Sequence, residues 1–409
     1  MKEKLLHTPD GVRDIYDNEY KRKRKVMREL HRVLELYSYH DIQTPTFEYF
    51  DIFSKDKGSA PSNEMFKLFD RENNTLVLRP DITPSIARFV AKYYENEELP
   101  IRLCYEGNTY SNKVSHQGKL CEVTQLGVEL VNDDSSAADA ELLATVVDCF
   151  QAAGIQEFQI EVGEVEFFKG IIEEAGLDEE QEIAIREYIM NKNFFGLQEY
   201  VKRLEISGHM KQILTSFDQL FGGPEMLERA RELVQNQRSQ TAISRLEKVY
   251  HALSYYHCEE HVGFDLSMVS DYKYYTGILF KGYTYGTGDA VVRGGRYNAL
   301  LKQFGKDAPA IGFAFVIDEL MKAIDRQNIP VVIEEKEAVI LYHQEWQQKA
   351  IELGCQMRRS GKKVELIRMS AKKTLVDYEV YAEKEHFETL LYISEDGRET
   401  SRTLKRIKA

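Results

Sequence analysis

The chain has 409 residues, of which 43% are hydrophobic, so it is long enough for two or three domains with separate cores. Its 67 acidic residues outnumber the 54 basic ones, and the net charge of -13 excludes a global basic field that would attract nucleic acid. The five cysteines are scattered without a CxxC pair or a histidine cluster, so we expect reduced thiols and no metal site. No apolar signal core or stretch of roughly 18 apolar residues is present, which predicts a cytoplasmic protein without membrane contact.

The first elements are a long helix and three short strands. Apolar residues spaced along one face predict a helix over residues 17–37. The strand that follows is interrupted by Pro45, which cannot donate to a sheet ladder, so it should lie at an edge or at a dimer interface. Two further strands are predicted at 65–69 and 75–78, joined by a turn.

The segment LRPDITPSIARFVAKYY leads from a strand end into a helix. Thr83 followed by Pro84 has the pattern of a hydroxyl N-cap with proline at the first helical position. The positive end of this helix would then face Arg79 and Asp81, a combination found at small-molecule sites. Simple capping of the helix by Asp81 is the alternative, and for this segment taken alone it is the better explanation.

The stretch from Tyr105 to Leu130 is predicted to be a loop that leads into a strand. Because successive side chains of a strand point to opposite faces, Gln125, Gly127 and Glu129 should share one face. A glycine inside a strand often marks the close approach of a ligand. A solvent-facing strand with a bulge is the alternative.

The remaining elements alternate between helix and strand character. The spacing predicts a helix at 135–153, a helical insertion at 164–257, and strands at 158–163, 262–269, 277–285 and 290–292. GGRYNALLKQFG is expected to turn into a helix, and AIGFAFVIDELMKAI to run from a strand into one. From residue 331 the pattern is βαβαβ, which predicts a small α/β domain of residues 331–409 with nearly balanced charge.

The order of these motifs resembles class II histidyl-tRNA synthetases over nearly the whole chain. The resemblance implies an α+β fold in which helices flank an antiparallel catalytic sheet. It divides the chain into a synthetase-like core of residues 1–163 and 258–328, the helical insertion, and a C-terminal domain that resembles an anticodon-binding domain. The core is also expected to form a self-dimer.

The resemblance implies a histidine pocket. In that family, an LRPE-x-T segment, a Gln-x-x-x-Glu strand and a tyrosine pair bind the amino acid, and a GGRY turn completes the site. The matching histidine-binding residues here are Asp81, Thr83, Gln125, Glu129, Tyr274 and Tyr275, with Arg79, Gly127, Gly294, Gly295 and Arg296 as possible lining residues. Asp81 departs from the family glutamate by one methylene group, which implies weaker affinity or a bridging water.

The nucleotide side of the family site is not matched. Adenylation needs arginines that clamp the ATP phosphates, because a planar guanidinium binds phosphate oxygens through two hydrogen bonds. Three positions at which the family has arginine are Ser111, Ser270 and Glu319 in this chain. Loss of one such donor typically costs about 10² to 10³ in rate, so we expect no catalytic residues and no bound cofactor. A shifted alignment, with Lys113, Lys119 or Arg293 as substitutes, is the alternative.

A histidine pocket without ATP chemistry resembles the regulatory subunits of ATP phosphoribosyltransferase, a family of synthetase paralogues. The resemblance implies no enzymatic activity, a hetero-octamer with the short-form catalytic subunit, and L-histidine as the feedback inhibitor of the first step of histidine biosynthesis. No tRNA binding is expected. Two alternatives are an authentic histidyl-tRNA synthetase and a tRNA-binding accessory protein.

Overall fold

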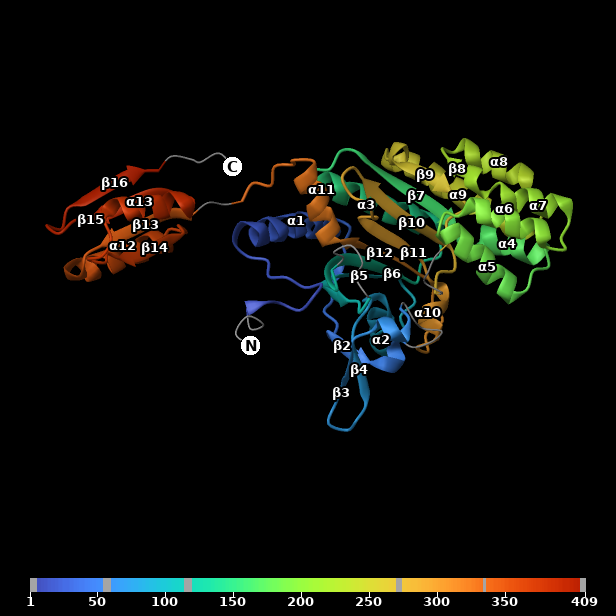
Figure 1. The fold of residues 1–409 in the computed structure, drawn as a ribbon, viewed down its shortest axis with the longest axis horizontal. Coiled ribbons are helices and arrows are strands. Elements are labelled where there is room, and N and C mark those ends of the chain that lie inside the picture. Colours follow the sequence, from blue (N-terminus) through green and yellow to red (C-terminus); the bar gives the residue numbers. More distant parts are fainter. Residues whose placement is uncertain (1–5, 54–59, 114–119, 270–273, 334–335, 405–409) are drawn as a thin grey trace. The chain divides into compact units, whose positions relative to one another are not determined.

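The computed structural model describes residues 6–53, 60–113, 120–269, 274–333 and 336–404. The chain divides into two compact units, Met1–Val331 and Val332–Ala409 (Figure 1). The insertion at 164–257 lies within the first unit, and its standing as a separate domain stays a prediction.

A nine-stranded sheet forms the centre of the first unit, in the order β1-β5-β6-β12-β11-β10-β7-β9-β8. The central neighbours from β5 to β7 are antiparallel, whereas β1 runs parallel to β5 and β9 runs parallel to β7. This mixed sheet confirms the predicted α+β class with an antiparallel centre. The strands are β1 (His40–Asp41), β5 (Ile101–Tyr110), β6 (Glu122–Val131), β7 (Phe158–Glu164), β8 (Phe221–Gly222), β9 (Val262–Asp265), β10 (Ile278–Thr284), β11 (Val292–Arg296) and β12 (Ala310–Val316).

One face of this sheet is covered by long helices. The alternation along β6 sends Leu126, Val128 and Leu130 to this face, where they are fully buried in the largest apolar cluster. Apolar side chains of the covering helices, such as Leu30, join the same cluster. The helices on this side are α1 (Asp17–Leu36), α3 (Ser136–Ala152) and α11 (Ile317–Arg326).

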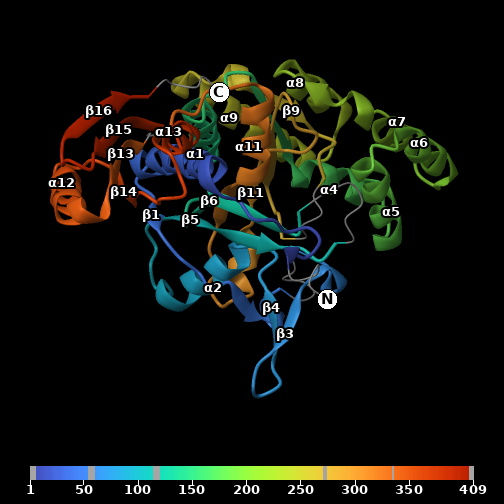
Figure 2. The ribbon, with the colours of Figure 1, turned by 60° about the vertical axis from the view of Figure 1, so that its left-hand side comes forward.

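The opposite face carries a second, smaller apolar cluster that includes Ile86, Leu103 and Leu300. Figure 2 shows α2 and the β3–β4 hairpin on the side of β5 and β6 that lies away from α1 and α11. The elements here are α2 (Thr83–Tyr93), α10 (Asn298–Lys302) and a three-stranded antiparallel sheet of β2 (Phe47–Tyr49), β4 (Thr75–Leu78) and β3 (Lys67–Phe69).

The chain between β7 and β9 is mainly helical, as the sequence predicts. Helix breaks coincide with caps, for example the capping box in which Asp178 and Gln181 bond each other's backbone amides. The helix α9 lies against α3 and α4, so the insertion packs on the core. These helices are α4 (Val165–Glu174), α5 (Glu179–Met190), α6 (Phe194–Arg203), α7 (Gly208–Thr215), α8 (Glu225–Leu233) and α9 (Gln237–Tyr256).

The second unit is a four-stranded sheet in the order β14-β13-β15-β16. The first three strands are parallel, as the βαβαβ pattern predicts, and β16 adds an antiparallel edge that the pattern did not predict. Its elements are β13 (Lys336–Tyr342), α12 (Gln347–Arg359), β14 (Val364–Arg368), α13 (Leu375–Lys384), β15 (Phe387–Ile393) and β16 (Glu399–Thr403). In the described part of the chain, no helix has the length and apolar character that crossing a membrane requires.

The loop expected from Tyr105 onward is wrong in its first part, because the residues up to Tyr110 belong to strand β5. Two further local predictions were wrong. Helix α2 already includes Thr83, and its N-cap is Ile82, so the Thr83 hydroxyl does not cap the helix. Gly294 and Gly295 do not form a turn, because they lie inside strand β11 and pair with β10 and β12. In both places a local turn or cap signal was overridden by tertiary contacts of the same residues.

Candidate functional site

A small cavity of about 50 Å³ lies between the sheet and α2, and it collects residues from distant parts of the chain. Six of its lining residues are those predicted to bind histidine: Asp81, Thr83, Gln125, Glu129, Tyr274 and Tyr275. The others are Tyr105, Arg293, Gly295, Tyr297, Gly312, Phe313, Ala314 and Val316. Because the cavity is tight, a ligand as large as an amino acid requires side chains at its rim to move.

Glu129 forms the polar floor of the cavity. Its side chain is 1% exposed, and its carboxyl accepts hydrogen bonds from Thr83 Oγ1 at 2.8 Å and from the Tyr297 hydroxyl. Burial away from water raises the pKa of Glu129 to about 8, although the hydrogen bonds from Tyr297 and Thr83 act in the opposite direction. Each carboxylate oxygen has a second lone pair, so Glu129 keeps acceptor capacity toward a ligand.

Asp81 provides a second carboxylate on the same wall. Its Oδ2 accepts a hydrogen bond from the Tyr274 hydroxyl at 2.9 Å, and its Oδ1 accepts one from the backbone N–H of Thr83 at 3.2 Å. The ring of Tyr275 lies 5.0 Å from that of Tyr274, measured between centroids. The tyrosine pair therefore connects Asp81 to an aromatic wall.

Gln125 has an unused acceptor. Its side-chain Oε1 is buried and has no hydrogen-bond partner among the residues that the structure describes. A buried carbonyl oxygen without a partner typically costs about 1–3 kcal/mol, so such groups usually meet a ligand or water. The amide oxygen is thus an acceptor open to a ligand or to a water molecule.

Gly127 has a different role from the one predicted. A Cβ at this position would lie 2.7 Å from the phenol of Tyr105 and 2.3 Å from the carbonyl oxygen of Phe313. The bare backbone is therefore covered by Tyr105, and Gly127 is not among the cavity-lining residues. The close approach that the glycine permits is by a neighbouring side chain.

Arg79 also lies outside the cavity lining. Its buried guanidinium donates to the carbonyl oxygens of Asn108 and Thr44, both at 2.9 Å. A Cβ at Gly107 would lie 2.1 Å from an Arg79 nitrogen, so that glycine makes room for the guanidinium. Arg79 holds β5 to the chain segment before β2.

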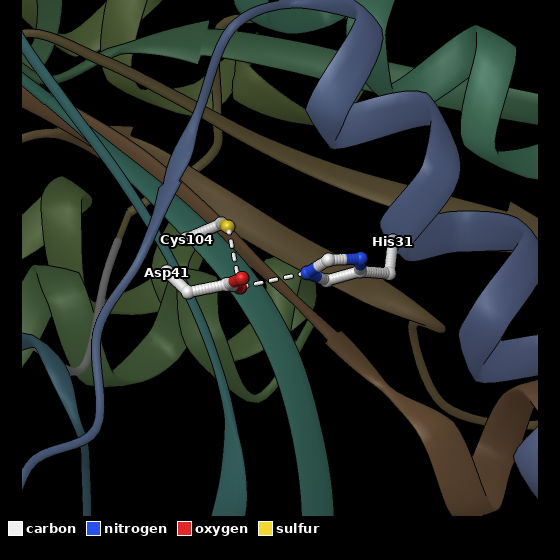
Figure 3. A group of neighbouring side chains, drawn as sticks. All are labelled: His31, Asp41 and Cys104. Carbon is white, nitrogen blue, oxygen red and sulfur yellow. Dashed lines mark hydrogen bonds and ion pairs between the residues drawn. The ribbon is translucent and has the colours of Figure 1, made fainter.

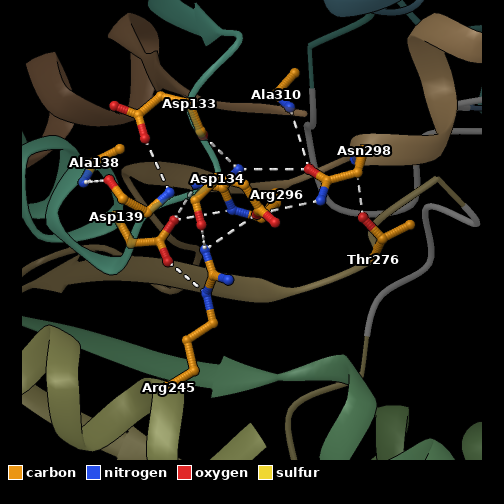
Figure 4. Close-up of polar contacts among 10 residues, drawn as sticks. Asp133, Asp134, Ala138, Asp139, Arg245, Thr276, Arg296, Asn298 and Ala310 are labelled. Atoms are coloured by element: carbon orange, nitrogen blue, oxygen red, sulfur yellow. Dashed lines mark hydrogen bonds and ion pairs between the residues drawn. The ribbon is translucent and has the colours of Figure 1, made fainter. Parts of the chain in front are cut away.

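Arg296 was predicted to line the pocket, but it points to the opposite face of the sheet (Figure 4). There its Nε donates to Asp139 Oδ1 at 3.0 Å, and Arg245 Nε donates to Asp139 Oδ2 at 2.7 Å. Gly294, two residues earlier, also lies outside the cavity lining, whereas Gly295 lines it. Successive residues of strand β11 face opposite sides of the sheet, so Gly295 faces the cavity while Gly294 and Arg296 face the other side.

Sequence reasoning named Tyr297 only as part of the GGRY motif and left out six other residues of the cavity, among them Tyr105 and Arg293. Arg293 and Tyr297 lie on the same side of β11 as Gly295, and Tyr105 covers Gly127. The sequence contained a signal for Arg293 and Tyr297. If GGRY is taken as part of a strand, every second residue faces the same side, which places Arg293 and Tyr297 on the side of Gly295. Arg293 is exposed, so it brings a cation to the rim of the cavity.

The positions that correspond to family arginines hold other contacts. Ser111 donates its backbone N–H to the carbonyl oxygen of Cys121, just before β6, at 2.8 Å. Glu319, in the first turn of α11, pairs with Lys322 at 2.7 Å. Lys113, a possible substitute, pairs with Glu64 at 3.1 Å. Ser270 and Lys119 lie outside the described residues.

The chain is similar in sequence to known proteins. The model of the histidyl-tRNA synthetase family matches residues 11–320. An ATP phosphoribosyltransferase regulatory subunit from Acetivibrio thermocellus is 37% identical over 366 residues, which covers 90% of this chain and 88% of that protein. One from Ruminiclostridium cellulolyticum is 34% identical over 400 residues, covering 98% and 95% of the two chains.

Solved structures agree with the sequence matches. An ATP phosphoribosyltransferase regulatory subunit/histidyl-tRNA synthetase from Bacillus halodurans superimposes with a TM-score of 0.85 at 33% identity, covering 95% of this chain and 98% of that one. The histidyl-tRNA synthetase from Nostoc sp. has a TM-score of 0.79 at 18% identity, with 97% of both chains covered. At that identity the likeness concerns the fold alone.

Proposed function

We propose that this chain, which belongs to the family of ATP phosphoribosyltransferase regulatory subunits, is the non-catalytic regulatory subunit of that enzyme. Similarity over nearly the whole length of its relatives supports this proposal. The reaction then takes place in a separate short-form catalytic subunit, in a hetero-octamer built on a self-dimer of the synthetase-like core. The task of this chain is to sense an effector and to pass the signal on.

The effector is L-histidine, bound in the cavity between β6 and α2. The observation that carries this proposal is the buried Oε1 of Gln125, which lacks a partner in the described part of the chain and lies in the same cavity as two carboxyl groups. An amino acid supplies an ammonium group with three donors, and histidine adds a ring N–H. The cavity therefore offers acceptors for the donors that distinguish this ligand.

Each part of the ligand has a matching group. The ammonium donates to Asp81 and Gln125, and the ring N–H donates to Glu129, which Thr83 and Tyr297 hold in place. The exposed Arg293 at the rim is placed to bind the α-carboxylate, since a guanidinium pairs with a carboxylate through two hydrogen bonds. These roles extend the sequence prediction by one residue, Arg293.

Aminoacylation is the rival activity, and the residues at the nucleotide side argue against it. Serine and glutamate at positions 111 and 319 cannot clamp a triphosphate, and Glu319 is negatively charged. Arg293 alone offers one cation at the rim, whereas stabilisation of the leaving pyrophosphate relies on several preorganised donors. The proposal therefore excludes both histidine activation and tRNA charging.

Feedback inhibition requires histidine to bind two arrangements of the complex with different affinity. A coupling free energy of about 1 to 3 kcal/mol, typical of allosteric proteins, changes affinity by about 5- to 150-fold. By linkage, any factor by which histidine changes the affinity of this chain for the catalytic subunit is also the factor by which the catalytic subunit changes the affinity of this chain for histidine. That reciprocity is measurable on the purified subunits.

The test combines this chain with a short-form catalytic subunit. Co-purification is expected, together with phosphoribosyltransferase activity that depends on this chain and falls when L-histidine is added. Full activity of the catalytic subunit alone, indifferent to this chain, would overturn the regulatory role. Activity that depends on this chain but ignores histidine would overturn the effector proposal only.

Two further assays separate the rivals. Histidine-dependent exchange of pyrophosphate into ATP by this chain alone would identify a synthetase. Binding of tRNA that weakens steeply with added salt would identify a tRNA-binding accessory protein, because each released counterion contributes to the salt dependence. We expect neither signal.

A further inference from the structure

Three side chains from separate elements meet at the edge of the nine-stranded sheet, away from the histidine cavity. His31 comes from α1, Asp41 from β1 and Cys104 from β5 (Figure 3). His31 Nε2 lies 2.7 Å from Asp41 Oδ1, and Cys104 Sγ lies 3.3 Å from the same oxygen. One nitrogen, one oxygen and one sulfur all lie within 4.8 Å of one another.

The fold sets this geometry firmly. Strands β1 and β5 pair in parallel with Asp41 directly opposite Cys104. The sulfur is buried against the helix-covered face, where Cys104 is 1% exposed and packs in the cluster that includes Leu30 of α1. His31 directly follows Leu30 in α1, and its imidazole reaches the pair from there. The three groups are therefore held by one strand pairing and one helix contact.

We propose that His31, Asp41 and Cys104 bind a divalent transition-metal ion of the Zn²⁺ type. Imidazole nitrogen, carboxylate oxygen and thiolate sulfur are the three kinds of protein ligand that zinc uses, and three of them leave a fourth position for water. A thiolate and an imidazole disfavour Mg²⁺ and Ca²⁺, which prefer oxygen ligands. The predicted absence of a metal site rested on the lack of ligand spacing in the sequence, a criterion that does not detect ligands from three distant segments.

The distances fit an ion after a small movement. Zinc bonds of about 2.0 to 2.3 Å around a tetrahedron separate ligand atoms by roughly 3.3 to 3.7 Å. The sulfur–oxygen distance of 3.3 Å already meets that range, whereas the nitrogen–oxygen distance of 2.7 Å must open. The nitrogen and the sulfur lie within 4.8 Å of each other and must also reach that range. Asp41 is the group free to move, because its side chain is 75% exposed.

Binding replaces a proton with the ion. In the metal-free protein the Cys104 thiol donates its hydrogen to Asp41 Oδ1 at 3.3 Å, so the sulfur carries a proton. The Cys104 S–H bond therefore breaks as the sulfur–metal bond forms, and one proton passes to solvent with no change of oxidation state. Glu35 and His40 are the other titratable groups near this cluster.

Glu35 stands where a metal-bound histidine needs a partner. Its Oε1 lies 3.7 Å from Nδ1 of His31, on the side of the ring opposite the Nε2 atom that faces the cluster. Metal-binding imidazoles usually donate their second N–H to a carboxylate, which fixes the ring orientation. Glu35 is a positioning residue in this proposal, and the ion ties the two-residue edge strand β1 to both α1 and β5.

The test uses the full chain, reduced and stripped of metal with a chelator, then titrated with Co²⁺ as a spectroscopic substitute for Zn²⁺. A 1:1 complex with a thiolate-to-cobalt charge-transfer band is expected, and Zn²⁺ should displace the cobalt while Mg²⁺ should not. Zn²⁺ should also raise the unfolding temperature and release about one proton per ion, as seen by calorimetry in buffers of different ionisation enthalpy.

Variants assign the ligands. His31→Gln and Asp41→Asn, both at the surface, should each weaken metal binding. The loss should exceed the factor of about 10 to 100 that is typical when a residue that only hydrogen-bonds a metal ligand is removed. Cys104→Ser should weaken binding and also remove the charge-transfer band. Cys355→Ser and His251→Gln, at exposed positions elsewhere, are the matched controls. They should keep the metal affinity and the charge-transfer band of the wild type. No binding by the wild type, or a band that survives Cys104→Ser, would overturn the proposal. So would unchanged affinity in both surface variants.

Discussion

Tyr297 donates its hydroxyl hydrogen bond to Glu129 across the intervening strand β12. The contact is possible because β12 carries Gly312 at this point, where a Cβ would lie 1.8 Å from Oε2 of Glu129. A buried carboxyl is thus held between a phenol, a threonine hydroxyl and bare backbone. Its protonation controls how it meets a ligand, and most of the predictions below concern this group.

The first prediction concerns stability and pH. The pKa of Glu129 is raised to about 8 in the folded chain and returns to its ordinary value near 4.5 on unfolding. Between these values the folded state holds a proton that the unfolded state has lost, so this contribution to stability falls as pH rises toward 8. The effect is at most about 1.4 kcal/mol per pH unit for one group.

Glu129→Gln should therefore flatten the pH profile of the unfolding free energy between about pH 5 and 8. The measurement is urea unfolding followed by circular dichroism at several pH values. Burial also raises the pKa of Glu164 to about 8, so part of the slope should survive in this variant and disappear in the double variant with Glu164→Gln. A slope identical to that of the wild type in both variants would contradict the assignment.

The second prediction concerns affinity for histidine. Gln125→Ala and Glu129→Ala should each weaken binding by about 10- to 150-fold, the equivalent of about 1.5–3 kcal/mol for a hydrogen bond to a charged group. Isothermal calorimetry measures the effect directly. Gln156→Ala, an exposed glutamine outside the cavity, is the matched control. Unchanged affinity in both cavity variants would place the effector elsewhere.

The third prediction concerns the pH dependence of that affinity. The ring N–H of neutral histidine needs the ionised form of Glu129, which is the minor form in the empty cavity below a pKa of about 8. Affinity should therefore rise with pH between about 6.5, the ordinary pKa of the ligand imidazole, and 8. Glu129→Gln should remove the rise. A flat profile in the wild type would mean that the carboxyl keeps its proton in the complex.

The fourth prediction concerns Arg296. Its side chain is 1% exposed and pairs with the fully buried Asp139, so truncation removes one of the two arginines that neutralise this carboxylate, the other being Arg245. Arg296→Ala should lower the unfolding free energy by about 3–5 kcal/mol. Arg22→Ala, which breaks a partly exposed pair with Asp325, should cost no more than about 1 kcal/mol. Circular dichroism is the appropriate signal, because the single tryptophan, Trp346, lies in the second unit.

The fifth prediction concerns lost chemistry. Ser111→Arg should not create histidine-dependent pyrophosphate exchange, because one guanidinium does not replace a set of several preorganised donors. The variant should still bind histidine, since Ser111 does not line the cavity. Measurable exchange in this single variant would mean that Arg293 and Lys113 already form most of a phosphate clamp.

The sequence allowed the two faces of β6 to be predicted, because strand alternation is a local property that needs no partner. The same rule would have placed Arg293, Gly295 and Tyr297 on the cavity side of β11. Gly294 and Gly295 instead led to the prediction of a turn, because two consecutive glycines are typical of turns. In this strand the glycines instead make room: a Cβ at Gly294 would meet Phe280 and one at Gly295 would meet Tyr275.

The sequence alone predicted most of the helices and strands and a boundary near residue 331, and its resemblance to histidyl-tRNA synthetases implied the six residues that meet in the cavity. Only the tertiary structure decided that Arg296 faces Asp139 and that His31, Asp41 and Cys104 share one point in space. Periodicity reports which face a side chain takes within its own element. Which element lies opposite depends on sheet register and helix packing, and these arise from contacts between residues far apart in the chain.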